Sequence, residues 1–135
     1  MIRYAFKEGL CEAKNQDENY ILNNAALEGN LRIIKSLIEC GCKVDPKNCL
    51  GYTPLVNASD QGHLEIVKHL VSAGANIEEK GKLGKNALIW ATSSNHLEVV
   101  KYLISVGANK DAKDDNGKTC IDYANSEIKN YLNSV

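Results

Sequence analysis

Three cysteines lie close together in the sequence at a spacing that suits a metal ion. Cys40 and Cys42 are two positions apart, and Cys49 follows seven positions later. Thiolates arranged in this way bind Zn²⁺ when a fourth ligand comes from elsewhere in the fold. Cys120 stands at the start of an expected helix, where the helix dipole lowers the pKa of a thiol, although packing at the helix start is the better interpretation.

No other set of residues supports catalysis. No histidine or carboxylate recurs beside the cysteines, and the sequence has no glycine-rich phosphate loop, no paired carboxylates and no nucleophile with an adjacent base. We therefore predict that the protein is not an enzyme and that it binds no cofactor and no metal. A cysteine-based metal or redox site is the weaker alternative.

The composition is that of a single folded domain. The 135 residues are 44% hydrophobic, and sixteen Lys and Arg nearly balance seventeen Asp and Glu, for a net charge of −1. This balance gives no overall positive field for nucleic acid or an anionic membrane. No run reaches the roughly eighteen apolar residues of a membrane span, and the first residues lack the apolar stretch of a signal peptide. With an odd number of cysteines, five, we expect the cytoplasm or nucleus, where thiols stay reduced.

The elements that would position these residues repeat along the chain every 33 residues. We call a set of positions that lie 33 residues apart a column. Glycine recurs in two columns: Gly41, Gly74 and Gly107, then Gly51, Gly84 and Gly117. Apolar residues keep the same register in further columns: Ala25, Ala58, Ala91 and Ala124; Leu22, Leu55, Leu88 and Ile121; Ile34, Val67 and Val100; Leu37, Leu70 and Leu103. A fixed period of this length predicts units that stack into a solenoid.

Each unit has the pattern of two helices joined by a turn. In one unit, Thr53-Pro54 suits a helix N-cap followed by the first helical position, and residues 55–59 have the spacing of one helix face. Residues 64–71 have the spacing of a second, longer helix, with a turn at 61–63 between the two. We expect this second helix to end at Gly74, because glycine adopts the left-handed conformation without steric cost.

The stretch from Gly51 to Asn76 resembles an ankyrin repeat almost position for position, and similar units cover most of the chain. The resemblance implies an all-α ankyrin-repeat solenoid of 33-residue helix–turn–helix units with β-hairpin or loop fingers. We expect a single ankyrin-repeat domain over 1–135. Its expected parts are an N-terminal capping helix or partial repeat at 1–18, repeats at 19–46, 47–79 and 80–112, and a shortened C-terminal capping repeat at 113–135.

The resemblance also implies structural roles for residues with chemical potential. His63 and His96 fall in one column, where an imidazole bonds to nearby backbone, and Asn95 replaces the glycine that usually precedes this histidine. Cys40 and Cys42 fall where other units have alanine or valine, so both are predicted to pack as small apolar residues. This placement argues against the zinc site.

Ankyrin-like proteins bind other proteins on a concave surface made of the fingers and the first helices, and the resemblance implies the same use here. Columns that change type between units are free for recognition, because they lie outside the columns that stack. The candidate partner-binding residues are Lys47, Leu50, Tyr52, Asp60, Lys80, Lys82, Leu83, Lys85, Ser93, Lys113 and Lys118.

Two features distinguish these fingers from solvated loops. Lysine recurs at positions 47, 80 and 113, and such a basic row favours a partner with an acidic surface. Leu50, Leu83 and Tyr52 are apolar or aromatic where a monomer has no packing reason for them, which makes them candidate anchors. Alternatively, the lysines keep the fingers soluble and the leucines pack on neighbouring fingers.

The predicted function is therefore that of a monomeric, non-catalytic protein-interaction module: a scaffold, adaptor or inhibitor. The alternative is a structural spacer or a fragment of a longer array whose binding sites lie elsewhere.

Overall fold

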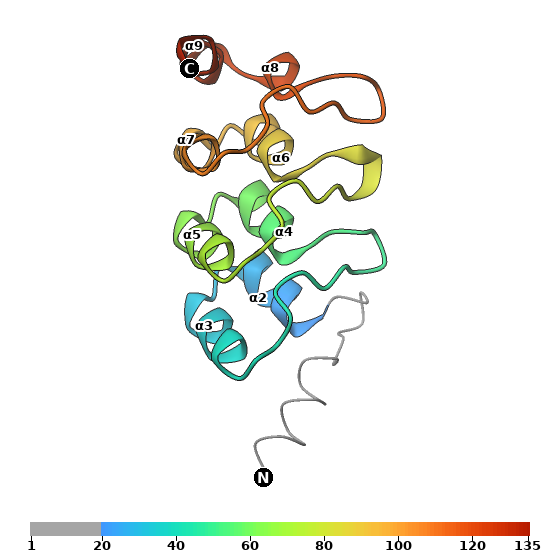
Figure 1. The fold of residues 1–135 in the computed structure, drawn as a ribbon, viewed down its shortest axis with the longest axis vertical. Helices are drawn as coiled ribbons and strands as arrows, with labels where there is room; N and C mark the ends of the chain where they lie inside the picture. The colour runs from blue at the N-terminus through green and yellow to red at the C-terminus, as the bar shows by residue number, and fades with distance from the viewer. Residues whose placement is uncertain (1–19) are drawn as a thin grey trace.

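The computed structural model describes residues 20–135, and over this range the chain is a stack of helix pairs (Figure 1). The elements are α2 (Ile21–Glu28), α3 (Leu31–Glu39), α4 (Pro54–Gln61), α5 (Leu64–Ser72), the 3₁₀ helix η1 (Lys82–Gly84), α6 (Ala87–Ser93), α7 (Leu97–Ser105), α8 (Cys120–Tyr123) and α9 (Ser126–Ser134). The all-α solenoid is confirmed. The cap or partial repeat predicted at 1–18 lies outside the described residues, and the repeat boundaries stay a prediction.

The helices form two layers (Figure 1). The first helices α2, α4, α6 and α8 contact one another in order, and the second helices α3, α5, α7 and α9 do the same. The alanine that recurs in the first helices allows this close approach, since Ala58 of α4 and Ala91 of α6 are fully buried. Leu70 and Leu103 of the second helices are likewise fully buried. The 33-residue columns are thus the contacts between repeats.

Local capping explains where the helices begin and end. Thr53 Oγ1 accepts a hydrogen bond from the Val56 N–H at 3.3 Å, with Pro54 in the first turn, as the sequence predicts. Gly74 follows the end of α5 at φ +100°. Its N–H donates to the Val71 carbonyl, and this bond satisfies one of the carbonyls that the helix end leaves open.

The two histidines of the repeated column join neighbouring repeats. His63 Nε2 lies 3.1 Å from the Leu27 carbonyl oxygen, and His96 Nε2 lies 2.9 Å from that of Asp60. Each ring therefore bonds to the backbone of the preceding first helix, near its C-terminal end. The structural role implied for His63 and His96 is confirmed.

These imidazoles also explain why a glycine follows each of the preceding first helices. A Cβ on Gly62 would lie 2.5 Å from Nδ1 of His96, and one on Gly29 would lie 2.7 Å from Cε1 of His63. Both glycines have positive φ, +78° and +80°. The third member of the column is Asn95, which keeps the left-handed conformation at φ +63°. No histidine follows in the shortened last unit, so a side chain is tolerated there.

The fingers take the loop form of the expectation, since no strand occurs between residues 20 and 135. Besides a bond from its glycine N–H to the carbonyl three residues earlier, each finger closes with a backbone bond from an N–H to a carbonyl four residues later. These bonds join Asn48 to Tyr52 at 3.1 Å, Gly81 to Lys85 at 3.1 Å and Asp114 to Lys118 at 2.9 Å. These two bonds per finger form a tight turn and not a strand ladder.

The close contact between Gly62 and His96 makes a specific stability prediction. A Gly74→Ala variant is expected to lose about 1–2 kcal/mol of unfolding free energy, because only the left-handed backbone opposes the new Cβ, which meets nothing within 4 Å. Gly62→Ala is expected to lose about 1–3 kcal/mol more, because its Cβ also displaces the imidazole. Urea unfolding of both variants measures the difference.

Adding His96→Ala to each variant supplies the control. It is expected to remove most of the extra loss from Gly62→Ala and to leave the Gly74→Ala loss unchanged. Equal losses for the two glycine variants would contradict the proposed contact.

Candidate functional site: a groove on the concave surface

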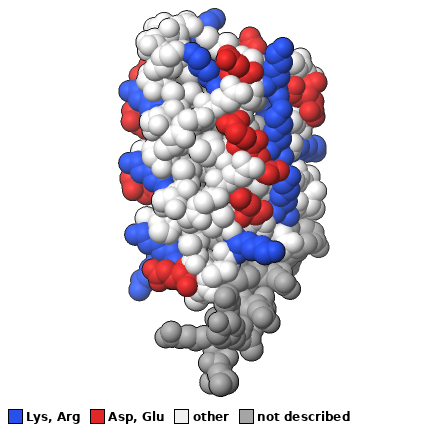
Figure 2. Space-filling model, viewed as in Figure 1, with Lys and Arg blue, Asp and Glu red and all other residues white. Residues whose placement is uncertain are grey.

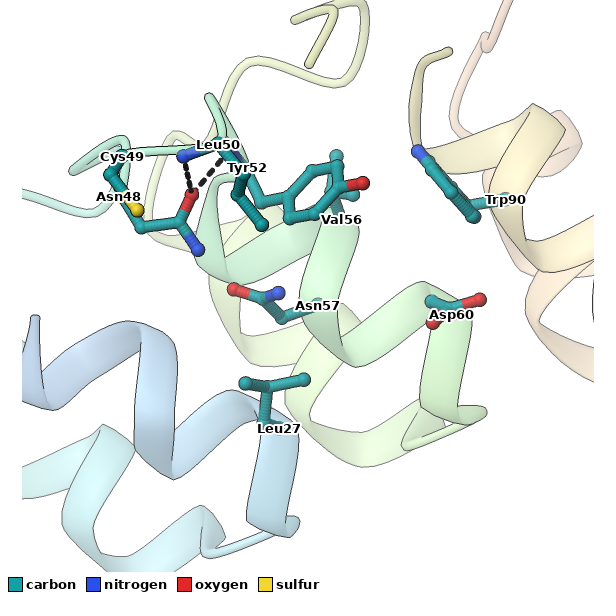
Figure 3. A pocket seen from close by; sticks show the side chains of 9 residues that line it. All are labelled: Leu27, Asn48, Cys49, Leu50, Tyr52, Val56, Asn57, Asp60 and Trp90. Carbon is teal, nitrogen blue, oxygen red and sulfur yellow. Dashed lines mark hydrogen bonds between the residues drawn. The ribbon is translucent and has the colours of Figure 1, made fainter. Parts of the chain in front are cut away.

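A groove of about 490 Å³ lies where the first helices meet the fingers (Figure 3). Its lining comes from α2, α4, α6 and the first described finger. The lining residues are Leu27, Asn48, Cys49, Leu50, Tyr52, Val56, Asn57, Asp60 and Trp90. Most of this surface is apolar or aromatic, and the polar groups are few, as in typical binding clefts.

Tyr52 and Trp90 form the aromatic wall of the groove. Their ring centroids are 5.6 Å apart and the ring planes meet at 88°, an edge-to-face pair. The next finger makes room for Tyr52, because a Cβ on Gly81 would lie 2.9 Å from the tyrosine ring. Tyr52 thus contacts the following repeat, contrary to its expected position outside the repeat contacts.

Asn23 fixes the finger that carries Tyr52. Its side chain is fully buried, and Nδ2 donates to the carbonyls of Pro46 at 3.1 Å and Tyr52 at 3.0 Å, and faces Asn57 Oδ1 at 3.2 Å. These acceptors lie at both ends of the finger and on α4. No residue pattern in the sequence marks Asn23, since its column continues with Val56 and Ile89.

An Asx side chain shapes two of the three fingers. Asn48 Oδ1 accepts from the N–H groups of Leu50 at 3.0 Å and Tyr52 at 2.9 Å, and Asp114 occupies the same position in the last finger. The middle finger has Gly81 in this column and so lacks the acceptor. There Leu83 adopts φ +69°, a left-handed conformation that is costly for leucine.

Lysine and aromatic side chains continue the concave surface beyond the groove. Lys85 Nζ lies 4.9 Å from the ring centroid of Trp90 and 4.5 Å from that of Tyr123. Lys118 Nζ lies 5.7 Å from the Tyr123 centroid. Lys85, like Tyr52, is therefore not free of repeat contacts, because it bridges two first helices.

The Tyr123 hydroxyl donates a hydrogen bond to Asp114 Oδ2. This bond lowers the pKa of the Asp114 carboxyl, with further lowering from the backbone N–H groups of Lys118 and Asn116 and from the Lys85 charge, against the opposing effect of burial. The same bond is the main cause that raises the pKa of Tyr123. The pair fixes the last finger to α8.

Part of the predicted basic row serves the fold. Lys47 forms an ion pair with Glu79, and Lys80 Nζ donates to the Lys113 carbonyl at 2.9 Å. Figure 2 shows the Lys and Arg side chains along the finger side with Asp and Glu side chains directly beside them. The row is therefore partly neutralised within the molecule. Lys82, Lys113 and Lys118 are exposed and enter no ion pair among residues 20–135.

The groove collects only part of the predicted set, namely Leu50, Tyr52 and Asp60. Leu83 lies on the next finger, 47% exposed like Leu50, and Ser93 is exposed at the end of α6. Six groove residues are not among the predicted binding residues: Leu27, Asn48, Cys49, Val56, Asn57 and Trp90. Leu27 and Cys49 nevertheless share their columns with the predicted Asp60 and Lys82. Trp90 had a usable signal, because its column holds Asn57 and Tyr123 and so changes type between units.

The cysteines between residues 20 and 135 lie in different environments. Across residues 20–135, no group of three or more His, Cys, Asp or Glu side chains is placed to hold a metal ion. Cys42 is buried and disulfide-bonded, which differs from the expectation of reduced thiols, whereas Cys40 and Cys49 are exposed thiols. Cys120 is 1% exposed, and burial raises the pKa of its thiol to about 11, so the helix start does not activate it.

Comparison with known families identifies the scaffold that carries this groove. A family model described as ankyrin repeats in three copies matches residues 2–81 and 74–135. The chain belongs to the ankyrin-repeat family. Ankyrin repeats commonly mediate contacts between proteins and are generally not catalytic. A search of curated proteins found no match to the chain. Between residues 20 and 135, no helix has the length and apolar character needed to span a bilayer.

The Asp114–Tyr123 bond predicts a loss of stability in acid. The pKa of Asp114 is lower in the folded than in the unfolded chain, so its contribution is present above the unfolded pKa and is lost as pH falls through the folded one. Urea unfolding between neutral pH and pH 3 is expected to show this loss. Asp114→Asn should reduce the acid dependence, whereas Asp111→Asn, the same change at an exposed aspartate of this ankyrin domain, should retain it.

The cysteine environments predict selective labelling. At pH 8 only about one in a thousand Cys120 thiols is ionised, given its pKa of about 11, and its burial blocks access. Iodoacetamide followed by peptide mapping is expected to modify Cys40 and Cys49 in the folded protein and Cys120 only after unfolding. Rapid labelling of native Cys120 would contradict its placement in the core.

Proposed function

We propose that this ankyrin-repeat chain is a non-catalytic protein-interaction module that holds a partner in the groove between the fingers and the first helices. The observation that carries this proposal is the edge-to-face pair of Tyr52 and Trp90 at an open groove lined by apolar side chains. Tyrosine and tryptophan are the residues that most often dominate binding energy at protein interfaces.

The apolar rim supports a binding role over a purely structural one. Leu50 is 47% exposed at the groove, and the fold gains little from a leucine in this position. Leu27 and Trp90 are half-buried, so part of each side chain remains available to a partner. A contiguous apolar surface of this kind on a soluble protein commonly marks an interaction site.

The exposed finger lysines add a second, peripheral contact. Lys82, Lys113 and Lys118 keep their charges at the surface and favour acidic residues on the partner outside the groove. Lys47 and Lys80 contribute less, since each already bonds within the chain. In this proposal the protein acts as a monomeric scaffold, adaptor or inhibitor, and a cytoplasmic or nuclear location stays a prediction.

A pair of charge-matched variants tests the groove. Leu50→Glu places a carboxylate on the apolar rim, and Val106→Glu makes the same change at a 37% exposed residue beyond the end of the outer helix α7. We expect Leu50→Glu to reduce capture of a specific partner from native extract by about tenfold or more, because the groove must then bury an unpaired charge. Quantitative mass spectrometry of the captured proteins measures the change.

The Val106→Glu variant is expected to capture the same partner as the unmodified chain. Thermal melting of both variants checks that they are folded. Identical capture by all three proteins would refute the groove as the binding site and would favour a spacer role with binding sites elsewhere.

A further inference from the structure

We propose that the groove receives a positively charged side chain of the partner, a lysine or an arginine, between Tyr52, Trp90 and Asp60. This inference rests on the proposed function and specifies the chemistry of the partner at its central contact. Figure 3 shows the three side chains bordering one opening, with Leu27 and Asn57 below it.

Asp60 gives the groove its charge. It is the one charged residue among those that line the groove, and it enters no ion pair within residues 20–135. Its carboxylate accepts from Ser94 Oγ at 2.6 Å and from Gln61 Nε2 at 3.4 Å. Both donors are neutral, so the negative charge is held in place but not cancelled. A carboxylate retains further acceptor positions for a cationic donor.

The aromatic wall favours the same type of ligand. Tyr52 and Trp90 meet at 88°, so the two rings present differently oriented surfaces to the groove. The face of an aromatic ring carries negative electrostatic potential and attracts ammonium and guanidinium groups within about 6 Å. The Tyr52 ring and the Asp60 carboxylate therefore act on a cation in the same direction, whereas the Lys85 ammonium already lies 4.9 Å from the Trp90 centroid.

The neighbouring repeat shows how a lysine uses this surface. Lys85 occupies the position 33 residues after Tyr52, and its ammonium lies 4.9 Å from the centroid of Trp90 and 4.5 Å from that of Tyr123, near Asp114. One repeat earlier the position holds Tyr52 itself, and no cation of the described residues lies over its ring. Lys85 thus supplies a cation to Trp90 and Tyr123, while the Tyr52 ring has none and is left to a partner.

The size and lining of the groove suit a long side chain. A volume of about 490 Å³ exceeds what one lysine or arginine side chain fills, which leaves room for the adjoining backbone. Leu27 and Leu50 provide apolar surface for the methylene groups, and the charged end then reaches Asp60. Lysine and arginine are equivalent in this arrangement, except that the planar guanidinium stacks better on the rings.

A peptide titration tests the charge preference directly. The probes are acetyl-Gly-Leu-Arg-Leu-Gly-amide, the same peptide with citrulline, and the same peptide with glutamate. Citrulline keeps the shape of arginine without its charge. Trp90 is the single tryptophan of the chain, so its fluorescence reports on the groove. We expect the arginine peptide to bind about tenfold more tightly than the citrulline peptide, and the glutamate peptide to bind weakest.

Two variants with the same charge change separate the groove from the overall charge. Asp60→Asn keeps an oxygen for the Ser94 hydroxyl but removes the negative charge, and it is expected to abolish most of the preference for arginine over citrulline. Glu98→Gln on the outer helix α7, where Glu98 pairs with Lys101 at 3.8 Å, is expected to keep the full preference.

The proposal is overturned if the citrulline or glutamate peptide binds as tightly as the arginine peptide, or if no probe shifts the Trp90 signal. Its failure is distinguishable from failure of the proposed function. A partner lost on Leu50→Glu but retained on Asp60→Asn would keep the groove as the binding site and would exclude the cation subsite.

Discussion

Each repeat of this chain buries its apolar helix faces against the next repeat, and this nearest-neighbour contact holds every other feature in place. The buried alanines allow the first helices to approach, while the leucines and valines of the second helices fill the outer layer. His63 and His96 add a polar link, since each ring bonds to a carbonyl of the repeat before it. The stack is therefore stabilised by many equivalent interfaces and not by one central core.

The binding surface arises where the repetition is broken. Tyr52 stands where the next two units have lysine, and Trp90 stands between Asn57 and Tyr123 in its own column. Each of these side chains lies beside one from the following or preceding repeat, so a row of rings and ammonium groups runs along the first helices. Tyr52 and Trp90 lie in columns that change type between units, yet each contacts a neighbouring repeat. They therefore stabilise the stack as well as line the groove.

Several charged side chains of the concave surface also form contacts between repeats. Lys47 and Lys80 connect one finger to the next, and Lys85 is held between two rings. Asp60 links α4 to Ser94 while it keeps its charge at the groove. A row of like charges in the sequence therefore says little about the field at the surface, because the partners of each charge come from other repeats.

The sequence by itself determined the repeat, the helix caps and the fold class. These depend on local rules: a threonine or asparagine caps a helix, a glycine adopts positive φ, and apolar residues recur at helical spacing. A 33-residue period then specifies the stacking partner of each column, because each unit meets its neighbour in the same way. For this reason His63, His96 and the ends of the helices were predictable without coordinates.

Tertiary structure alone decided which variable residues form the groove. Leu50, Tyr52 and Asp60 were predicted, but Trp90 meets Tyr52 through a contact 38 residues apart in sequence, and the buried Asn23 holds the Tyr52 backbone from 29 residues away. The column of a residue predicts on which face of the solenoid its side chain lies. It does not predict how far that side chain lies from the others on the same face. The lysines at 47 and 80 had the right position for a partner, yet neighbouring repeats already supply their acceptors.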